Sequence, residues 1–578
     1  MIHPLRRTLV RSVLLFSFFC TATKSFAQLL QQKNTYTLAD TLRGSLNENR
    51  DWWDVLRYDI TVKPNFEKKE IEGKVIIQAI ATKRGNQLQI DLQQPLIVDS
   101  IVRKGNYFIK NGTTLTSIHE TFSFKQEGNI ILIILNDFKY LGERFDFHIF
   151  YHGKPIEART PPWDGGWIWK KDKNGNPFVS VAVQGLGASA WYPCKDYQGD
   201  EPDNGASLTM IVPDTLVAIA NGKLSKLSNF STNLLSYKWE VTNPINNYCI
   251  VPYIGKYVNF TDTLMGEKGK LDISYWVLDY NVKKAKEQYK QVKPMLHAFE
   301  YWFGPYPFYE DGYKLIDAPH LGMEHQSAVA YGNQYKNGYL GMDRSASGWG
   351  KKWDFIIVHE SGHEWFANNI TTKDIADMWV HEAFTTYSET LFTEYYYGIQ
   401  AGNEYNFGQR RNIRNDKPII GAYGVNKEGS GDQYDKGSNM IHSIRHAMND
   451  DKKFRGILRG LNKTFWHKTV TTKEIEDYIC KQAGFTFQKV FDQYLRTTQI
   501  PTLAYYFSTD NNKMYYRYMD CVEGFNLPIV FAIDNNSIKI QPNINWNFIN
   551  VTPAIQNFIA AKNIEKLYYI KTKEVTNP

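Results

Sequence analysis

The chain has 578 residues, a length that predicts three or four folding units and excludes a single small module. Hydrophobic residues make up 43% and charged residues 22%, a balance that excludes a disordered chain. The net charge is +7, and it falls to +3 without the basic residues of residues 1–27. Because no basic block is interleaved with aromatic residues, the sequence carries no electrostatic footprint for nucleic acid.

Residues 1–27 have the pattern of a secretory signal peptide. Arginines precede a short apolar run, and small residues at Ser25 and Ala27 follow it. Small residues at these positions suit signal peptidase, so we expect cleavage before Gln28. A membrane anchor is the alternative, but the run is shorter than the about 20 residues that span a bilayer. Lipid attachment at Cys20 ranks lower, since phenylalanines stand where a lipoprotein signal carries small residues. We expect an exported protein, periplasmic or extracellular, without stable membrane insertion.

The mature chain divides into three regions by pattern. Residues 28–255 alternate apolar and polar side chains with period two, which predicts a large antiparallel β domain. Residues 501–578 hold short apolar runs between turns rich in Asp and Asn, which predict a small β-sandwich-like domain. The region between them, residues 256–500, is predicted to be mainly helical, with helices over 282–303, 353–368, 380–397, 438–448 and 472–483. The expected fold is therefore multidomain α+β.

The helical pattern over 353–368 contains an HExxH sequence, formed by His359, Glu360 and His363. The two histidines are four residues apart, so their imidazoles project from one helical face and can bind the same metal ion. Zinc lowers the pKa of a bound water to about 7, and Glu360 beside it can take the proton and deliver it to a leaving amine. The motif predicts a zinc-dependent hydrolase.

A catalytic zinc needs a third protein ligand and an open coordination position. Eighteen residues separate His363 from Glu382, which begins the next helical pattern and can return to the metal. Residues 379–384 read Trp-Val-His-Glu-Ala-Phe and resemble the Trp-Leu-Asn-Glu-Gly-Phe pattern of the aminopeptidase N and leukotriene hydrolase family of gluzincins. We expect His359, His363 and Glu382 to bind one zinc ion per chain.

Residues 321–325 read Leu-Gly-Met-Glu-His and resemble the Gly-x-Met-Glu-Asn element of the same family, which lies along the substrate cleft. The resemblance implies that Gly322 and Met323 line the cleft and that Glu324 binds the free α-amino group of the substrate. A fixed anion for a desolvated ammonium restricts attack to the first peptide bond, which makes the enzyme an exopeptidase. The leucine and histidine at the ends of the element depart from the family pattern, so contacts beside it are expected to differ.

Three further positions take their roles from the resemblance. Tyr434, in Tyr-Asp-Lys-Gly, matches the family tyrosine whose hydroxyl stabilises the tetrahedral oxyanion. Gln184 matches a residue that helps to hold the amino terminus, whereas Leu186 stands where family aminopeptidases often carry a glutamate. Recognition is therefore expected to depend more on Glu324. Glu389 matches a carboxylate that orients the metal ligands, and a surface glutamate is the alternative reading.

The resemblance covers residues from about 50 to 500 and implies a thermolysin-like catalytic domain at 256–500. The predicted function is an exported zinc aminopeptidase that acts on peptides with a free amino terminus. One alternative is a zinc endopeptidase of the same clan, against which Glu324 argues. The other is a catalytically silent peptide-binding protein, against which the complete set of motif residues argues. The sequence does not set the preferred first side chain, the oligomeric state or any disulfide pairing.

Overall fold

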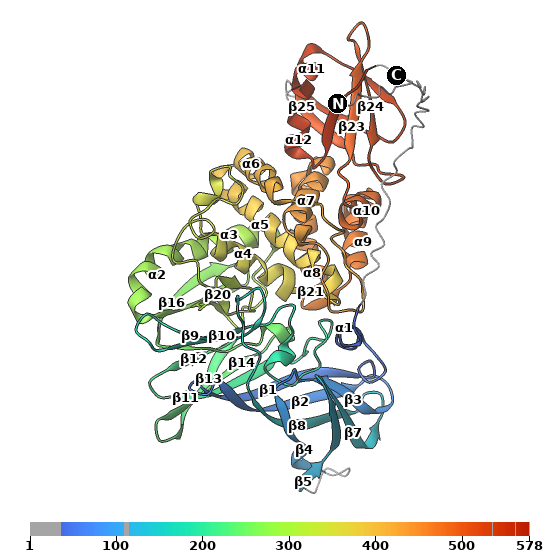
Figure 1. Ribbon diagram of the computed structural model, residues 1–578. Helices are drawn as coiled ribbons and strands as arrows, with labels where there is room; N and C mark the ends of the chain where they lie inside the picture. Colours follow the sequence, from blue (N-terminus) through green and yellow to red (C-terminus); the bar gives the residue numbers. More distant parts are fainter. Residues whose placement is uncertain (1–35, 109–114, 534–535, 561, 577–578) are drawn as a thin grey trace, which may run out of the picture.

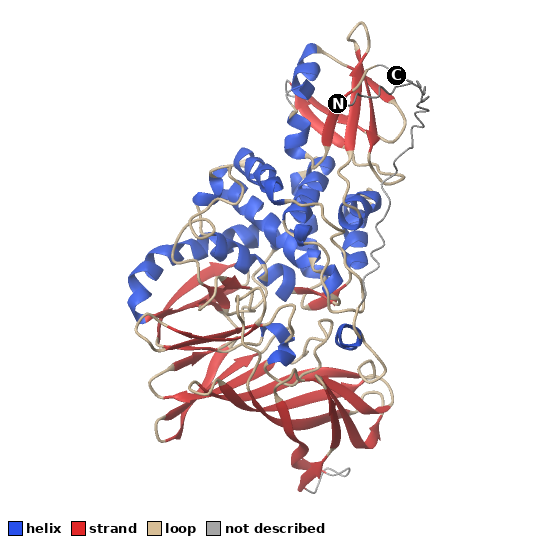
Figure 2. Ribbon diagram, in the orientation of Figure 1, coloured by secondary structure: helices blue, strands red, loops and turns tan. Residues whose placement is uncertain are grey.

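The computed structural model describes residues 36–108, 115–533, 536–560 and 562–576. The predicted signal peptide and Cys20 lie outside these residues. Sheets form the N-terminal end of the molecule, helices fill its middle, and a small domain rich in strands stands at the far end (Figures 1 and 2). The expected multidomain α+β fold is confirmed.

The N-terminal region is built on an eight-stranded sheet in which β1 pairs with β2 antiparallel and with β11 in parallel. Buried and half-buried residues alternate along β1, as its sequence pattern predicted. In sheet order the strands are β13 (Lys223–Ser231), β14 (Leu234–Val241), β11 (Ala206–Pro213), β1 (Trp53–Asn65), β2 (Glu70–Ala81), β8 (Arg144–Gly153), β4 (Ile97–Phe108) and β5 (Leu115–Thr121).

Two smaller sheets and one helix complete this region. The helix α1 (Leu38–Gly44) begins at a capping box formed by Thr37 and Asp40. One sheet contains β3 (Gly85–Asp91), β7 (Ile130–Lys139) and β6 (Ser123–Glu127). The other, which leads toward the middle of the molecule, contains β12 (Val217–Ile219), β15 (Tyr253–Gly255), β10 (Pro177–Ala182) and β9 (Gly166–Lys171).

The middle region contains a five-stranded sheet, although its sequence pattern was predicted to be mainly helical. The short strand β19 is an edge of this sheet, so its outer backbone groups have no neighbouring strand within it. In sheet order the strands are β16 (Tyr257–Gly266), β17 (Gly269–Leu278), β18 (Tyr313–Asp317), β20 (Val329–Tyr331) and β19 (Gly322–Met323).

Helices pack around the face of this sheet (Figure 2). Two of them lie between β17 and β18 in the chain, and the others follow β20. Their apolar side chains share one core with those of the sheet. The helices are α2 (Val282–Gln288), α3 (Val292–Phe303), α4 (Phe355–Gly362), α5 (Trp379–Tyr397), α6 (Ile399–Gln409), α7 (Asp435–Met448), α8 (Asp451–Thr464), α9 (Thr472–Ala483) and α10 (Gln488–Arg496). Two short strands, β21 (Ile370–Thr372) and β22 (Lys468–Val470), pair in parallel and join two segments of this region that are far apart in sequence.

Two of the expected helices are broken. The single helix predicted over 282–303 is two helices joined by a short 3₁₀ turn at Tyr289–Gln291. Pro294, which lacks a backbone N–H, lies in the first turn of the second helix, where that donor is not needed. The helix predicted over 353–368 leaves helical geometry at Phe366 and Ala367, the latter with φ 146°. In contrast, α9 has the predicted bounds and begins at a capping box.

The C-terminal region contains a four-stranded sheet, a separate hairpin and two helices that the sequence pattern did not indicate. Its apolar residues belong to the same core as the helices of the middle region, so it is packed continuously onto them. The sheet contains β27 (Asn547–Asn550), β24 (Lys513–Met519), β23 (Thr502–Phe507) and β28 (Lys571–Glu574); the hairpin is β25 (Ile529–Ile533) and β26 (Asn536–Ile540); the helices are α11 (Pro553–Ala560) and α12 (Asn563–Leu567).

Among the described residues, no helix is both long enough and apolar enough to cross a bilayer. The cysteines of this part of the chain, Cys194, Cys249, Cys480 and Cys521, are all unpaired.

Candidate functional site

The HExxH sequence lies at the C-terminal end of α4, with His363 as the C-cap residue, and the start of this helix is fixed by Asp354. The Asp354 side chain accepts hydrogen bonds from the backbone N–H groups of Ile356 and Ile357, as an N-cap residue does. His359 and His363 follow one turn apart, with ring centroids 5.0 Å from each other. The helix therefore presents both imidazoles to the same space, as their spacing predicted.

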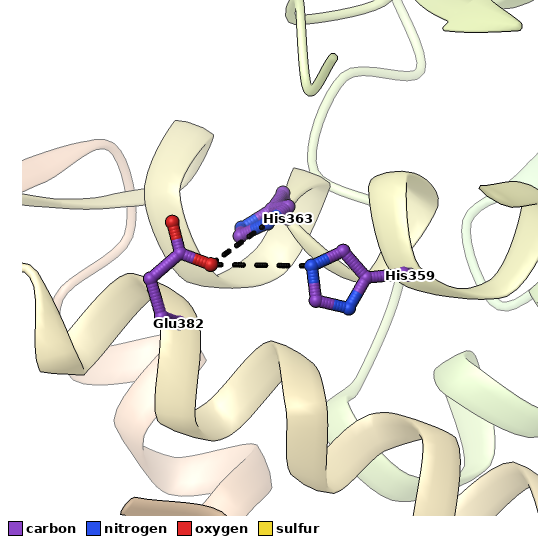
Figure 3. Close-up of side chains that lie close together, drawn as sticks. All are labelled: His359, His363 and Glu382. Atoms are coloured by element: carbon purple, nitrogen blue, oxygen red, sulfur yellow. Dashed lines mark ion pairs between the residues drawn. The ribbon is translucent and has the colours of Figure 1, made fainter. Parts of the chain in front are cut away.

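Glu382, from the first turn of α5, completes the cluster. Its Oε2 atom lies 3.5 Å from Nε2 of His363 and 3.9 Å from Nε2 of His359. Figure 3 shows this carboxylate oxygen facing both rings from the neighbouring helix. The predicted ligands thus come together, with their candidate donor atoms all within 4.8 Å of one another.

The donor atoms fit a zinc ion. Oε2 of Glu382 is buried and has no hydrogen-bond partner, an arrangement that costs free energy unless a cation fills the space. Nδ1 of each histidine is already engaged: that of His359 lies 2.7 Å from Glu389, and that of His363 lies 3.1 Å from the Phe366 carbonyl oxygen. Each Nε2 atom is left to bind a metal, and two imidazoles with one carboxylate match a catalytic zinc site.

Burial sets the protonation of this cluster. It lowers the pKa of His359 to about 3 and that of His363 to about 4, so both rings are neutral at physiological pH, as metal binding requires. Burial also raises the pKa values of Glu382 and Glu360 well above their usual range, and the nearby Glu324 adds to both shifts. A bound dication would favour the charged carboxylates and reverse this effect.

Glu360 and Glu324 face the same space beside the histidines. Carboxylate oxygens of both lie within 4.8 Å of each other and of a His363 nitrogen. Gly322 makes this approach sterically available, because a Cβ atom at that position would lie 2.6 Å from Oε1 of Glu360. Met323 is buried next to it. Gly322 and Met323 form the edge strand β19, beside which an extended peptide can lie as an added strand.

Residues of the β domain and of the catalytic domain hold Glu324 in place. Nε2 of Gln184 donates a hydrogen bond to Oε1 of Glu324, and the Tyr248 hydroxyl donates to the same oxygen at 3.1 Å. The Asn368 side chain donates to the Glu324 backbone oxygen at 2.9 Å. Gln184 is thus brought next to Glu324, from a domain that lies far away in sequence.

Tyr434 lies beside the ring of His359. Its ring stacks on the His359 ring with centroids 6.1 Å apart, and its hydroxyl is among the groups that act on the Glu382 carboxyl. Burial raises the Tyr434 pKa well above 10, so the phenol is protonated and can donate a hydrogen bond. The residue directly precedes α7 and is half-buried, so it can reach a bound substrate.

The residues that depart from the family pattern pack against the hydrophobic cores or pair with a buried side chain. Leu186 packs against the β-domain core, where its side chain approaches Gly165. His325 is buried, and its Nδ1 atom is paired with the Tyr253 hydroxyl. Leu321 is half-buried and packs against the catalytic core.

Sequence reasoning missed the groups that support the site from other elements. Tyr248 contacts Glu324, and Thr385, one turn beyond Glu382, lies 3.0 Å from Nδ1 of His363. Tyr405 and Gln409 of α6 donate to Glu389 at 2.6 and 2.9 Å. Only Thr385 had a usable signal, since it shares a helical face with the third ligand. The others come from elements that only the tertiary fold brings to the site.

Two domain descriptions of one family match the chain. The peptidase M1 N-terminal domain matches residues 55–249, and the peptidase family M1 domain matches residues 288–494. The chain belongs to peptidase family M1. This confirms the family identified from the sequence and places the chain among the zinc metallopeptidases.

Curated relatives are distant and longer. Leukotriene A-4 hydrolase of Xenopus laevis is 22% identical over 347 residues, which are 56% of this chain and 53% of that protein. Aminopeptidase B of Mus musculus is 22% identical over 331 residues, which are 54% of this chain and 47% of that protein. The chain thus spans about half the length of these relatives.

Solved structures show the same fold. An M1 zinc metallopeptidase variant from Deinococcus radiodurans superposes with a TM-score of 0.64 at 19% identity, covering 78% of this chain and 96% of that one. The same protein bound to a Tyr-Ser-Ala substrate superposes with a TM-score of 0.62, at the same identity and coverage. The similarity therefore shows the fold over about three quarters of the chain.

Proposed function

We propose that this M1-family chain is an exported zinc aminopeptidase that hydrolyses the first peptide bond of peptides. The observation that carries the proposal is the position of Glu324, a buried carboxylate held by Gln184 and Tyr248 within 4.8 Å of the Glu360 and His363 donor atoms. An anion fixed at that distance can bind the substrate ammonium one residue away from the scissile bond. The tripeptide bound to the Deinococcus relative supports peptides as the substrate class.

Each residue of the proposed site has a separate role in the reaction. One zinc ion, held by His359, His363 and Glu382, supplies Lewis acidity that lowers the pKa of a water and polarises the carbonyl. Glu360 takes a proton from the attacking water and then gives it to the leaving amine. Tyr434 donates a hydrogen bond to the oxyanion as the carbonyl becomes tetrahedral.

The supporting groups keep these residues in place. Glu324 and Gln184 hold the substrate ammonium, and Glu389 fixes the orientation of the His359 ring. The edge strand β19 aligns the peptide backbone. Glu324 and Glu389 act from buried positions, which limits their freedom to move during the reaction, whereas Gln184 is half-buried.

Replacing Glu360 by Gln tests this mechanism. The amide cannot accept the water proton, so kcat is expected to fall by about a hundredfold or more while one zinc ion per chain is retained, as measured by atomic absorption. Glu523→Gln, which removes an exposed carboxylate in the C-terminal domain, is the matched control and should leave kcat unchanged. Full activity of the Glu360 variant would contradict the proposed role.

The proposal of export has its own test. Expression of the full chain in a bacterial host, followed by N-terminal sequencing, is expected to yield mature protein that begins at Gln28. An intact Met1 on all of the protein would contradict export through this segment.

A further inference from the structure

Glu428 is a carboxylate that the proposed mechanism does not use. It lies in the loop before Tyr434 and its side chain is exposed to solvent, unlike the buried carboxylates of the metal site. Oε2 accepts one hydrogen bond, from Nε2 of Gln433 at 3.3 Å. Oε1 accepts none from the described residues. The side chain therefore has a free acceptor that a ligand can reach.

The Glu428 loop is attached to the wall of the cleft that carries Gln184. A Cβ atom placed on Gly185 would lie 3.9 Å from Oε1 of Glu428. The Gly185 carbonyl oxygen accepts a hydrogen bond from Asn426 of the same loop at 3.0 Å, and another from Arg43 of α1 at 3.2 Å. Because Gly185 directly follows Gln184, these contacts place Glu428 near the entrance of the proposed substrate site.

The charges around Glu428 are unbalanced. Glu428 is one of three carboxylates, with Glu324 and Glu360, whose negative charge acts on the Glu382 carboxyl. A bound dication would offset only part of this negative charge. The positive charge of Lys417 acts on Glu428 from a distance, but within the described part of the chain Lys417 and Glu428 form no ion pair. The site therefore favours a substrate with more than one positive charge.

We propose that Glu428 recognises a cationic side chain on the first residue of the substrate, so that the protein prefers peptides beginning with arginine or lysine. This inference rests on the proposed aminopeptidase function. With the α-ammonium held at Glu324, a long basic side chain that turns toward Gly185 meets the free oxygen of Glu428. A charge-assisted hydrogen bond then forms between the side chain and the carboxylate.

The test compares two substrates of nearly the same shape. Arginine and citrulline differ in charge but little in size, so a peptide that begins with each, X-Ala-Ala, isolates the charge of the first side chain. For the zinc-loaded protein, kcat/KM is expected to be at least about tenfold higher for the arginine peptide. In Glu428→Gln that ratio is expected to approach one, and in Glu428→Lys to fall below one. Glu523→Gln should keep the wild-type ratio.

A binding measurement separates this inference from the proposed function. Argininamide and citrullinamide are titrated calorimetrically into Glu360→Gln protein, with and without the Glu428→Gln change. Tighter binding of argininamide that depends on Glu428 supports the inference even if no peptide is cleaved, in which case only the aminopeptidase function fails. Equal ratios in wild type and Glu428→Gln, in both measurements, would overturn the inference while leaving the aminopeptidase function intact.

Discussion

Nδ1 of His359 lies 2.7 Å from Oε1 of Glu389, a residue seven positions beyond Glu382 on the same helix. The second oxygen of Glu389 accepts hydrogen bonds from Tyr405 and Gln409. The carboxylate is thus fixed on one side and orients the imidazole on the other, which leaves Nε2 to face the metal. One helix supplies both a proposed ligand and the group that aligns another ligand.

Glu389→Gln tests this relationship. The amide keeps the shape but loses the charge that supports the His359 ring, so zinc affinity is expected to fall by about tenfold to a hundredfold. Competition with a chromogenic chelator measures the change. Glu523→Gln should keep the wild-type affinity, and an unchanged affinity in the Glu389 variant would mean that Glu389 does not support the site.

Gly322 is expected to be needed for activity, because it has no side chain that would displace Glu360. In Gly322→Ala the new methyl group would lie 2.6 Å from Oε1 of Glu360 and 3.0 Å from two side-chain atoms of Ile356. Glu360 must then move, and kcat is expected to fall by about tenfold to a hundredfold with zinc content unchanged. Gly456→Ala is the matched control, because a Cβ atom there meets nothing within 4 Å. Equal kcat values for the two variants would count against the described position of Glu360.

Lys314 of β18 makes stability depend on pH. It is buried and donates a hydrogen bond to the Gly222 carbonyl oxygen, and burial lowers its pKa from 10.5 to about 7. Between these values the unfolded chain binds the proton and the folded chain does not, so the free energy of unfolding rises with pH. The slope is at most about 1.4 kcal/mol per pH unit. Below pH 7 the folded protein carries the full cost of the buried charge.

Lys314→Met removes this cost. The variant is therefore expected to be most favoured over wild type near pH 6 and to lose that advantage as the pH rises toward 10. Urea unfolding of both proteins at pH 6, 8 and 9.5 measures the difference in free energy of unfolding. A difference that does not change with pH would show that Lys314 titrates normally in the folded protein.

Local patterns predicted the parts of the molecule that local forces determine. The HExxH spacing and the bounds of α9 depend on helical periodicity and a capping box, both readable within a few residues. The strands β18, β19 and β20 are too short to show periodicity and form only by pairing with one another and with β17. The contact between Tyr248 and Glu324 joins two domains. Because the two residues are far apart in sequence, no local pattern predicted this contact.

Hydrolysis of a free peptide and of its N-acetylated twin tests the central claim most directly. Mature protein is assayed with both peptides, with and without a zinc chelator. We expect cleavage of the free peptide alone, because the Glu324 carboxylate binds the substrate ammonium group and acetylation removes that charge. This cleavage is expected to be lost on chelation and restored by zinc. Equal cleavage of both peptides would contradict the account and indicate an endopeptidase, and cleavage of neither with zinc present would favour a peptide-binding protein.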